Sequence, residues 1–353
     1  MSKYQILCDI EGLVGEIEAA LNKTYMTRLS ILDPSPVFQG RSAANALSET
    51  RALAQATDQM RYRSYWVQEH HNAASFAGTA PEVLMADLAA HTQRLSLGSG
   101  GIMLPNYSPL KVAELGQTLS ALHPGRIEIG LGRATGADPR ASAALLGPGA
   151  QTFPTMLRLA MDWWLDASDE KEIDADHRAT GIAANPPAPR PDLWLLCSSP
   201  ESAAFAGRMG VKLAYADFLN PDGAVQALRA YREAFDPSPF ASDPYCAIGL
   251  VALAAQTQAE AERLSSTMLA WSMARQTGQF TPYLMADEAT QALRSTGATA
   301  IQSHAIIGAA EEVADRLAQK AATANADELF VLTITESLES RIASYALLDE
   351  AFH

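Results

Sequence analysis

Three stretches decide the fold: YWVQEHHN at 65–72, LSLGSGGIMLP at 95–105 and HPGRIEIGLGR at 123–133. Each holds a short apolar run and then residues that are able to do chemistry. These residues are the His70–His71 pair, the Gly100–Gly101 pair and Arg133. Short apolar runs beside glycine or proline are typical of buried strands. We therefore expect three successive strands whose ends gather polar groups into one site.

The same alternation continues outward from these stretches. Strand-like runs are expected at 28–32, 65–68, 95–99, 127–131, 193–197, 212–216, 247–254 and 329–333. Segments of helical period lie at 43–60, 81–92, 109–122, 153–166, 200–208, 223–235, 258–276, 309–322 and 337–352. Eight strand–helix units predict an α/β fold, a (β/α)8 TIM-type barrel with insertions in the strand C-terminal loops. An open doubly wound sheet is the alternative.

Residues 1–25 do not fit this alternation. Their acidic residues contradict a signal peptide or a transit peptide. We expect an N-terminal extension at 1–25 and one barrel domain at 26–353. Two longer connections, 169–190 and 278–307, are candidates for a lid or a substrate pocket, because loops of this kind build the sites of barrels.

Composition excludes several classes of function. The formal net charge is -14, from 40 acidic and 26 basic residues, which disfavours nucleic acid and anionic membranes as partners. No apolar run approaches the ~18 residues of a membrane span. The three cysteines, Cys8, Cys197 and Cys246, form no CxxC pair. This spacing favours a reducing compartment, the cytoplasm, over a disulfide framework or a zinc site.

The His70–His71 pair follows the second expected strand. A histidine at this rim can act as a general base near neutral pH, although one of two adjacent histidines often only hydrogen-bonds a neighbouring loop. The two residues are consecutive and lack the spacing of an HExxH zinc motif, so no metal site is predicted.

Glycine and serine residues suggest where a flat, phosphorylated ligand would lie. Gly100 and Gly101 allow a planar group to approach the backbone, although a tight turn would also explain them. In the run LLCSSPES, Ser199 is a natural N-cap with Pro200 at the first helical position, and the helix start attracts anions. Together with Arg133 it predicts a phosphate cup.

These motifs resemble those of the bacterial luciferase-like flavin-dependent monooxygenases, in particular the single-chain luciferase-like oxidoreductase subgroup. The resemblance runs from about Met26 to the C-terminus, through RLSILDPSPV, YWVQEHHN, GSGGIMLPNYSPLKVAE, LHPGRIEIGLGRATG and LWLLCSSPES. It implies a barrel that binds FMN at the strand C-terminal ends. By position, His70 matches the catalytic histidine, and Gly100–Gly101 matches a non-proline cis peptide against the isoalloxazine. The phosphate-binding positions are matched by Arg133, Ser198, Ser199 and Ser202.

The chain departs from the subgroup at three places on the expected substrate side, one of them Cys197, where glycine is common. Asn106 and Tyr107 stand where a histidine is usual, and so do Asp217 and Phe218 after the sixth expected strand. These departures leave the substrate open more than they affect flavin binding.

The resemblance implies an enzyme that uses reduced FMN and O2 to oxygenate a small organic substrate. His70 would transfer protons, with His71 or Asp217 as its orienting partner. An NAD(P)H:flavin reductase would supply the reduced flavin, and family analogy implies a homodimer. The alternatives are a deazaflavin-dependent hydride-transfer oxidoreductase and a non-catalytic flavin-binding partner subunit. A metal-dependent hydrolase using His70, His71, Asp217 and His304 is what the residues would suggest without the resemblance.

Overall fold

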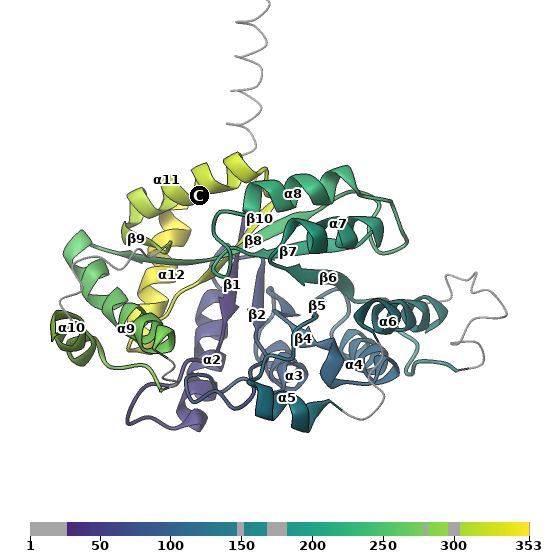
Figure 1. Cartoon of the computed structure of the whole chain (residues 1–353), viewed down its shortest axis with the longest axis horizontal. Helices are drawn as coiled ribbons and strands as arrows, with labels where there is room; N and C mark the ends of the chain where they lie inside the picture. Colours follow the sequence, from purple (N-terminus) through teal and green to yellow (C-terminus); the bar gives the residue numbers. More distant parts are fainter. Residues whose placement is uncertain (1–26, 147–151, 168–181, 278–280, 296–303, 353) are drawn as a thin grey trace, which may run out of the picture.

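The computed structural model describes residues 27–146, 152–167, 182–277, 281–295 and 304–352, which form a ring of helices around parallel strands (Figure 1). The expected extension at 1–25 lies outside the described residues. The strands are β1 (Arg28–Asp33), β2 (Ser64–Val67), β3 (Ser96–Ser99), β4 (Ile102–Met103), β5 (Ile127–Gly132), β6 (Asp192–Cys197), β7 (Lys212–Ala216), β8 (Cys246–Ala255), β9 (Ile306–Ala309) and β10 (Glu328–Leu332).

The sheet closes on itself, which confirms the barrel and rules out the open sheet. The strand order is β10-β1-β2-β3-β5-β6-β7-β8, and β10 pairs with β8 as well as with β1. All of these pairings are parallel; Leu329 is in register with Leu29 on one side and with Ile248 on the other. The eight expected strands are the eight strands of the barrel, while the short strands β4 and β9 were not expected.

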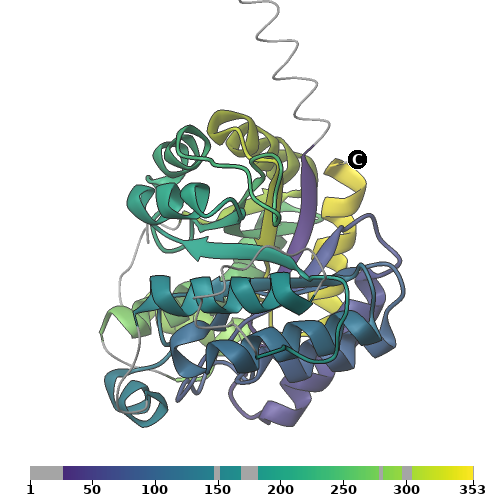
Figure 2. The same cartoon turned by 90° about the vertical axis from the view of Figure 1, so that its right-hand side faces the viewer.

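In the described ranges, eight helices cover the outside of the barrel, each after its strand. They are α2 (Ala43–Thr57), α3 (Pro81–His91), α4 (Pro109–Leu122), α6 (Phe153–Ala167), α7 (Pro200–Arg208), α8 (Ala224–Glu233), α11 (Ala310–Ala324) and α12 (Leu338–Phe352). Figure 2 shows α4 and α6 side by side over the strands. The last helix, α12, packs between α11 and α2 and so completes the ring. None of the described helices is long and apolar enough to cross a bilayer.

Capping side chains account for several helix starts. Ser42 forms a capping box with Asn45 at α2, and Thr257 accepts a hydrogen bond from Glu260 N at the start of α9 (Gln258–Gln276). The 278–307 connection contains α10 (Ala286–Ser295) and the first residues of β9, and α5 (Pro139–Leu145) follows β5. Of the 169–190 connection, residues 182–190 are irregular, as expected, and 168–181 lie outside the described residues.

Aromatic side chains fill the barrel interior. The ring of Trp66 contacts that of Trp194 edge-on, with 5.2 Å between centroids, and that of Phe330, with 4.2 Å. The Trp66 indole N–H donates to the buried Glu128 carboxylate at 2.7 Å. A side chain at Gly98 would overlap this indole, because a Cβ there would lie 2.1 Å from Trp66 Nε1.

We therefore expect Gly98→Ala to lower the free energy of unfolding by about 1–3 kcal/mol, the usual cost of overpacking a core. The indole must move, and Glu128 then loses a donor. Urea denaturation measures the change. The control is Gly308→Ala, whose added methyl group meets the flexible ends of two side chains, Gln258 at 3.1 Å and Glu312 at 3.4 Å. Equal stability of the two variants would contradict the expectation.

Candidate active site

A cavity of about 530 Å³ opens at the carboxyl ends of the barrel strands. Its wall comes from residues after β1, β2, β7 and β10 and from α9. The lining includes Pro34, Gln68, His70, Phe76, Asp217, Phe218, Val251, Trp271, Arg275, Tyr283, His304 and Ile334. The position and the volume are those of a ligand site in a barrel enzyme.

His70 lies in this cavity wall and carries an unsatisfied polar atom. Its backbone N–H donates to Gly78 O at 2.8 Å, and its ring packs on Phe76 with 4.4 Å between centroids. Its Nδ1 is buried without a hydrogen-bond partner in the described structure. Burial, with smaller contributions from the charges of Arg275 and His71, lowers the pKa of His70 to about 4. The imidazole is therefore neutral at pH 7 and can accept a proton.

His71 is not among the described lining residues of this cavity and contacts Glu69 instead. Its Nε2 lies 2.8 Å from Oε1 of Glu69, a fully buried carboxylate. Glu69 also accepts hydrogen bonds from Met103 N at 2.9 Å, Asn106 Nδ2 at 2.7 Å and the Tyr107 hydroxyl at 3.2 Å. The expected substrate-side residues Asn106 and Tyr107 thus bind Glu69, and neither they nor His71 are among the described lining residues of the cavity.

Sequence reasoning missed Glu69 as the centre of this network. A signal for it was present, because an acidic residue precedes the histidine pair and follows the apolar run after one intervening residue, Gln68. A buried carboxylate needs hydrogen-bond donors, and the loop after β3 provides them. Glu69 therefore fixes the position of the loop that carries both histidines.

Asp217 and Phe218 do line the cavity, as expected. Asp217 Oδ2 lies 2.9 Å from Lys320 Nζ, while Oδ1 is buried and unpartnered. Burial raises the pKa of Asp217, and Lys320 opposes this shift. Among the described residues, no hydrogen bond joins His70 to Asp217 or to His71, so the expected orienting contact does not form in this structure.

The metal-hydrolase alternative has no donor set in the described ranges. There, no three His, Cys, Asp or Glu side chains come together as metal ligands. His304 lines the cavity, but His71 is bound to Glu69 elsewhere.

The peptide bond between Gly100 and Gly101 is cis, as the resemblance implies. A side chain at Gly101 would meet backbone, and one at Gly100 would have to displace the end of Leu32. A Cβ at Gly101 would lie 2.3 Å from Leu196 Cδ1 and 2.7 Å from Gly130 O, and one at Gly100 would lie 2.7 Å from Leu32 Cδ1. The backbone at this glycine pair is thus closely packed against neighbouring strands.

The expected phosphate-binding residues come to one edge of the barrel. Strands β5 and β6 pair with Leu131 opposite Leu195, so Arg133 and Ser198 follow neighbouring strand ends. Ser199 caps α7 by accepting a hydrogen bond from Ser202 N at 3.3 Å, and Pro200 is the first helical residue. Arg133 is exposed and has no ion-pair partner in the described part of the chain. The N-cap prediction is confirmed, and the arrangement fits a phosphate group.

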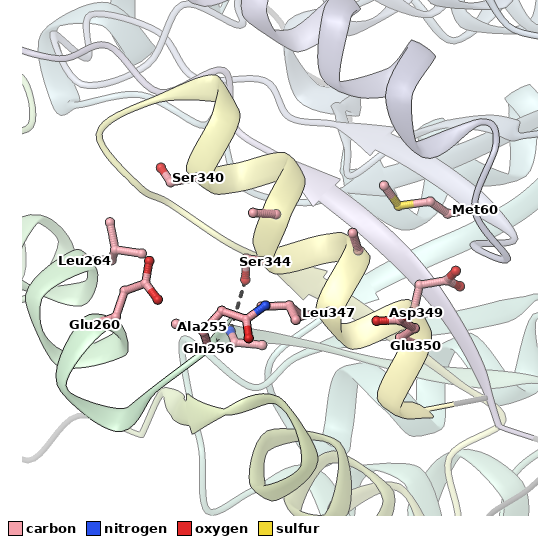
Figure 3. A pocket seen from close by; sticks show the side chains of 13 residues that line it. Met60, Ala255, Gln256, Glu260, Leu264, Ser340, Ser344, Leu347, Asp349 and Glu350 are labelled. Carbon is pink, nitrogen blue, oxygen red and sulfur yellow. Dashed lines mark hydrogen bonds between the residues drawn. The ribbon is translucent and has the colours of Figure 1, made fainter.

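A second cavity, of about 470 Å³, lies between α12, α9 and the C-terminal end of β8 and shares no described lining residue with the first (Figure 3). The Ala254 N–H donates to Ser344 Oγ across it at 3.0 Å. Its ionisable lining residues are Glu260, Asp349 and Glu350, with no basic side chain among the described residues of its wall. Such a wall disfavours an anionic cofactor.

Residues 27–327 match the profile of the luciferase-like monooxygenases. The chain belongs to this family. Membership supports an oxidoreductase activity.

Relatives cover nearly the whole chain. A luciferase-like monooxygenase of Escherichia coli (strain K12) is 35% identical over 90% of this chain and 95% of its own length. The N-acetyl-S-alkylcysteine monooxygenase of Bacillus subtilis (strain 168) is 33% identical over 92% and 98%. The crystal structure of apo-MsnO8 superposes with a TM-score of 0.84 at 33% identity, covering 93% of this chain and 98% of the other.

Two more distant structures share the fold and carry different cofactors. The oxygenating constituent of 3,6-diketocamphane monooxygenase from Pseudomonas putida, in complex with FMN, has a TM-score of 0.69 at 17% identity. An F420-dependent secondary alcohol dehydrogenase has a TM-score of 0.61 at 15% identity. At these identities the likeness shows the fold alone.

Proposed function

We propose that this protein is an FMN-dependent monooxygenase that uses reduced FMN and O2 to oxygenate a small organic substrate, with His70 in proton transfer. The observation that carries the proposal is the buried, unpartnered Nδ1 of a neutral His70 in the cavity at the strand C-terminal ends. A buried polar atom of this kind costs free energy unless a ligand or water satisfies it. We propose that FMN is the ligand that lies beside this Nδ1 atom.

The residues present fit such a cofactor. Gly100 and Gly101 would hold the planar ring against the backbone, and Arg133, Ser198, Ser199 and Ser202 would bind the phosphate. When bound, FMN supplies the electrons and the oxygen chemistry. The protein's own contribution is to hold the ring, exclude water and manage protons.

His70 is suited to proton transfer because its imidazole is neutral at pH 7 and its Nδ1 has no competing hydrogen bond from the residues that the structure describes. His71 would act indirectly, because its hydrogen bond to Glu69 holds the loop that both histidines share. Asp217, on the opposite side of the cavity, is held by Lys320 and has one oxygen left for a substrate or water.

The test is a pair of measurements on the purified protein. Fluorescence titration determines whether FMN or the deazaflavin F420 binds. Turnover under ¹⁸O2 with reduced FMN, supplied by an NAD(P)H:flavin reductase, is then followed by mass spectrometry on a panel of thioethers that includes N-acetyl-S-alkylcysteines, the class named for the B. subtilis relative. One ¹⁸O atom in the product supports the proposal. Stoichiometric FMN binding without O2 consumption would instead favour the non-catalytic partner subunit.

F420 binding with O2-independent hydride transfer would replace the proposal by the deazaflavin alternative, which the fold likeness to the F420-dependent dehydrogenase motivates. Sedimentation velocity on the same sample tests the homodimer that we also propose by family analogy.

Arg133→Met tests the phosphate cup. Loss of a charged donor to a phosphate typically weakens binding by about 1.5–3 kcal/mol, which is roughly a tenfold to hundredfold loss of affinity. We expect this loss for FMN and no loss for riboflavin, which has the same ring without a phosphate. Fluorescence titration with both ligands measures it. An equal effect on both ligands would place Arg133 outside the cup.

A further inference from the structure

We infer that Arg275, at the mouth of the active-site cavity, binds an anionic group of the substrate, so that the substrates are small organic carboxylates with an apolar body. The inference deepens the proposed function and rests on it for the statement that the cavity ligand is a substrate. Nothing in the family match or in the names of the relatives assigns a role to this residue.

The guanidinium of Arg275 lies against an aromatic ring at the rim of the cavity. Arg275 lies in the last turn of α9 and is exposed at the rim, and its Cζ stands 5.0 Å from the ring centroid of Trp271. A cation held on an aromatic face in this way presents its N–H donors at the edge of the guanidinium plane. A carboxylate fits that edge with two parallel hydrogen bonds.

The aromatic wall beneath Arg275 is itself held in place. Trp271 Nε1 donates to Ser75 Oγ at 2.7 Å, and the Trp271 ring stacks on Tyr283 with 5.0 Å between centroids. Tyr283 also lines the cavity, and its buried hydroxyl has no hydrogen-bond partner in the described structure. The wall thus offers a cation at the rim and an unsatisfied hydroxyl in the interior.

The balance of charge in the cavity favours an anion. Arg275 is the only lysine or arginine among the described lining residues. The carboxylate of Asp217 is compensated by Lys320 at 2.9 Å, and His70 is neutral at pH 7. On a protein with a formal net charge of -14, a local positive charge at the entrance also marks the entry route for an anion.

The remaining lining explains why the body of the ligand should be apolar. Phe76, Phe218, Val251, Met268, Leu269 and Leu332 face the same cavity. An apolar chain or ring would bury against these side chains while the anionic group stays at the exposed rim. The oxidisable atom would then enter first, toward His70.

Arg275 also stands apart from the proposed phosphate cup. It follows β8, whereas Arg133 and Ser198 follow β5 and β6, and β7 lies between the two regions. The test nevertheless includes a role in cofactor binding as one of its outcomes.

The experiment compares two probes of the same shape, 4-phenylbutanoate and the neutral 4-phenylbutyramide. Binding to the wild type, Arg275→Met, Arg275→Lys and the control Arg208→Met is followed by tryptophan fluorescence without flavin and by flavin absorbance with FMN bound. Arg208 is an exposed arginine at the far end of α7, so its replacement changes the net charge equally without touching the cavity.

We expect the wild type and Arg208→Met to bind the carboxylate at least tenfold more tightly than the amide. Arg275→Met should lose this preference with little change in the affinity for the amide, and Arg275→Lys should keep part of it. The inference is overturned if the wild type binds both probes equally or binds neither, or if Arg275→Met keeps the preference. A loss of FMN affinity in Arg275→Met with unchanged probe preference would also overturn it.

Failure of the monooxygenase proposal would give a different set of binding results from failure of the anion site. If FMN does not bind to the wild type while the carboxylate preference is present and depends on Arg275, the monooxygenase proposal falls and the anion site remains. If FMN binds equally to the wild type and to Arg275→Met but no preference is seen, only the anion site falls.

Discussion

His70→Ala is expected to lower the rate of substrate oxygenation by about 10²–10⁴-fold, the usual contribution of a positioned acid–base group. FMN affinity should stay unchanged, because the phosphate cup lies after β5 and β6 and the glycine pair after β3. The measurement is product formation from the thioether that the wild type oxygenates most rapidly, with reduced FMN in excess.

His91→Ala is the matched control, because this histidine sits on α3 with 41% of its side chain exposed and pairs with Asp87. It should keep the wild-type rate. If His70→Ala also turns over at the wild-type rate, the assignment of proton transfer to His70 is wrong.

The pH dependence follows from the pKa of His70, which burial lowers to about 4. The group must be neutral to accept a proton, so activity should persist down to about pH 4, where the imidazole becomes protonated, instead of falling near 6.5.

The lowered pKa of His70 also makes the free energy of unfolding depend on pH. Between pH 6.5 and about 4 the unfolded chain binds a proton at this position and the folded chain does not, so the contribution of His70 to stability falls as the pH falls through this window.

Arg341→Met is expected to lower the free energy of unfolding at pH 7 by about 3–5 kcal/mol, the typical cost of removing one partner of a buried ion pair. Arg341 and Asp33 are almost completely buried, with relative side-chain exposures of 1% and 0%, and their N···O distance is 2.8 Å. Asp33 also accepts hydrogen bonds from Tyr65 and Thr50. Without Arg341 its charge would stay buried and uncompensated.

The Asp33–Arg341 ion pair also predicts how the loss of stability in Arg341→Met varies with pH. Burial alone would raise the pKa of Asp33, but the charge of Arg341, with hydrogen bonds from Tyr65 and Thr50, brings it below its ordinary value of 3.8. Its stabilising contribution is therefore complete above pH 3.8 and is lost as the pH falls through the lower folded-state value. In Arg341→Met the carboxyl can neutralise itself by protonation in acid, so the destabilisation should be smaller at low pH than at pH 7.

Urea denaturation at pH 7 and at pH 4.5 measures both effects. Arg229→Met is the control, because Arg229 pairs with Glu233 on the exposed face of α8 and its removal should change stability little. Equal unfolding midpoints for the two variants at pH 7 would show that the buried pair does not hold α12 to the first strand.

The candidate site was only partly predictable from sequence. His70, Asp217 and Phe218 were expected in the site and line the cavity, and the Ser199–Pro200 cap forms as predicted. Asn106 and Tyr107 lie next in the chain to the glycine-rich turn, which gave no indication that both would turn toward Glu69. The direction in which the side chains of a loop point depends on which buried group needs hydrogen-bond donors. Here that group is Glu69, which is distant in sequence.

Trp271, Arg275 and Tyr283 could not have been singled out. The first two lie in a segment of ordinary helical period, and the third lies in a connection without a motif. What places them over His70 is the packing of α9 and the 281–285 segment on the barrel mouth, where Trp271 bonds to Ser75 across 196 positions of sequence. Long-range side-chain contacts of this kind leave no local pattern.

The sequence by itself determined the eight strands, the helices between them, the Ser199 cap and the glycine pair, because these depend on the period of apolar residues and on backbone preferences within a few residues. Only the tertiary structure decided the rest. Barrel closure joins β10 to β8 and β1, the Asp33–Arg341 pair ties the last helix to the first strand, and Arg275 reaches the cavity of His70. Each of these brings together residues far apart in the chain, and each depends on burial and charge balance that exist only once the barrel has closed.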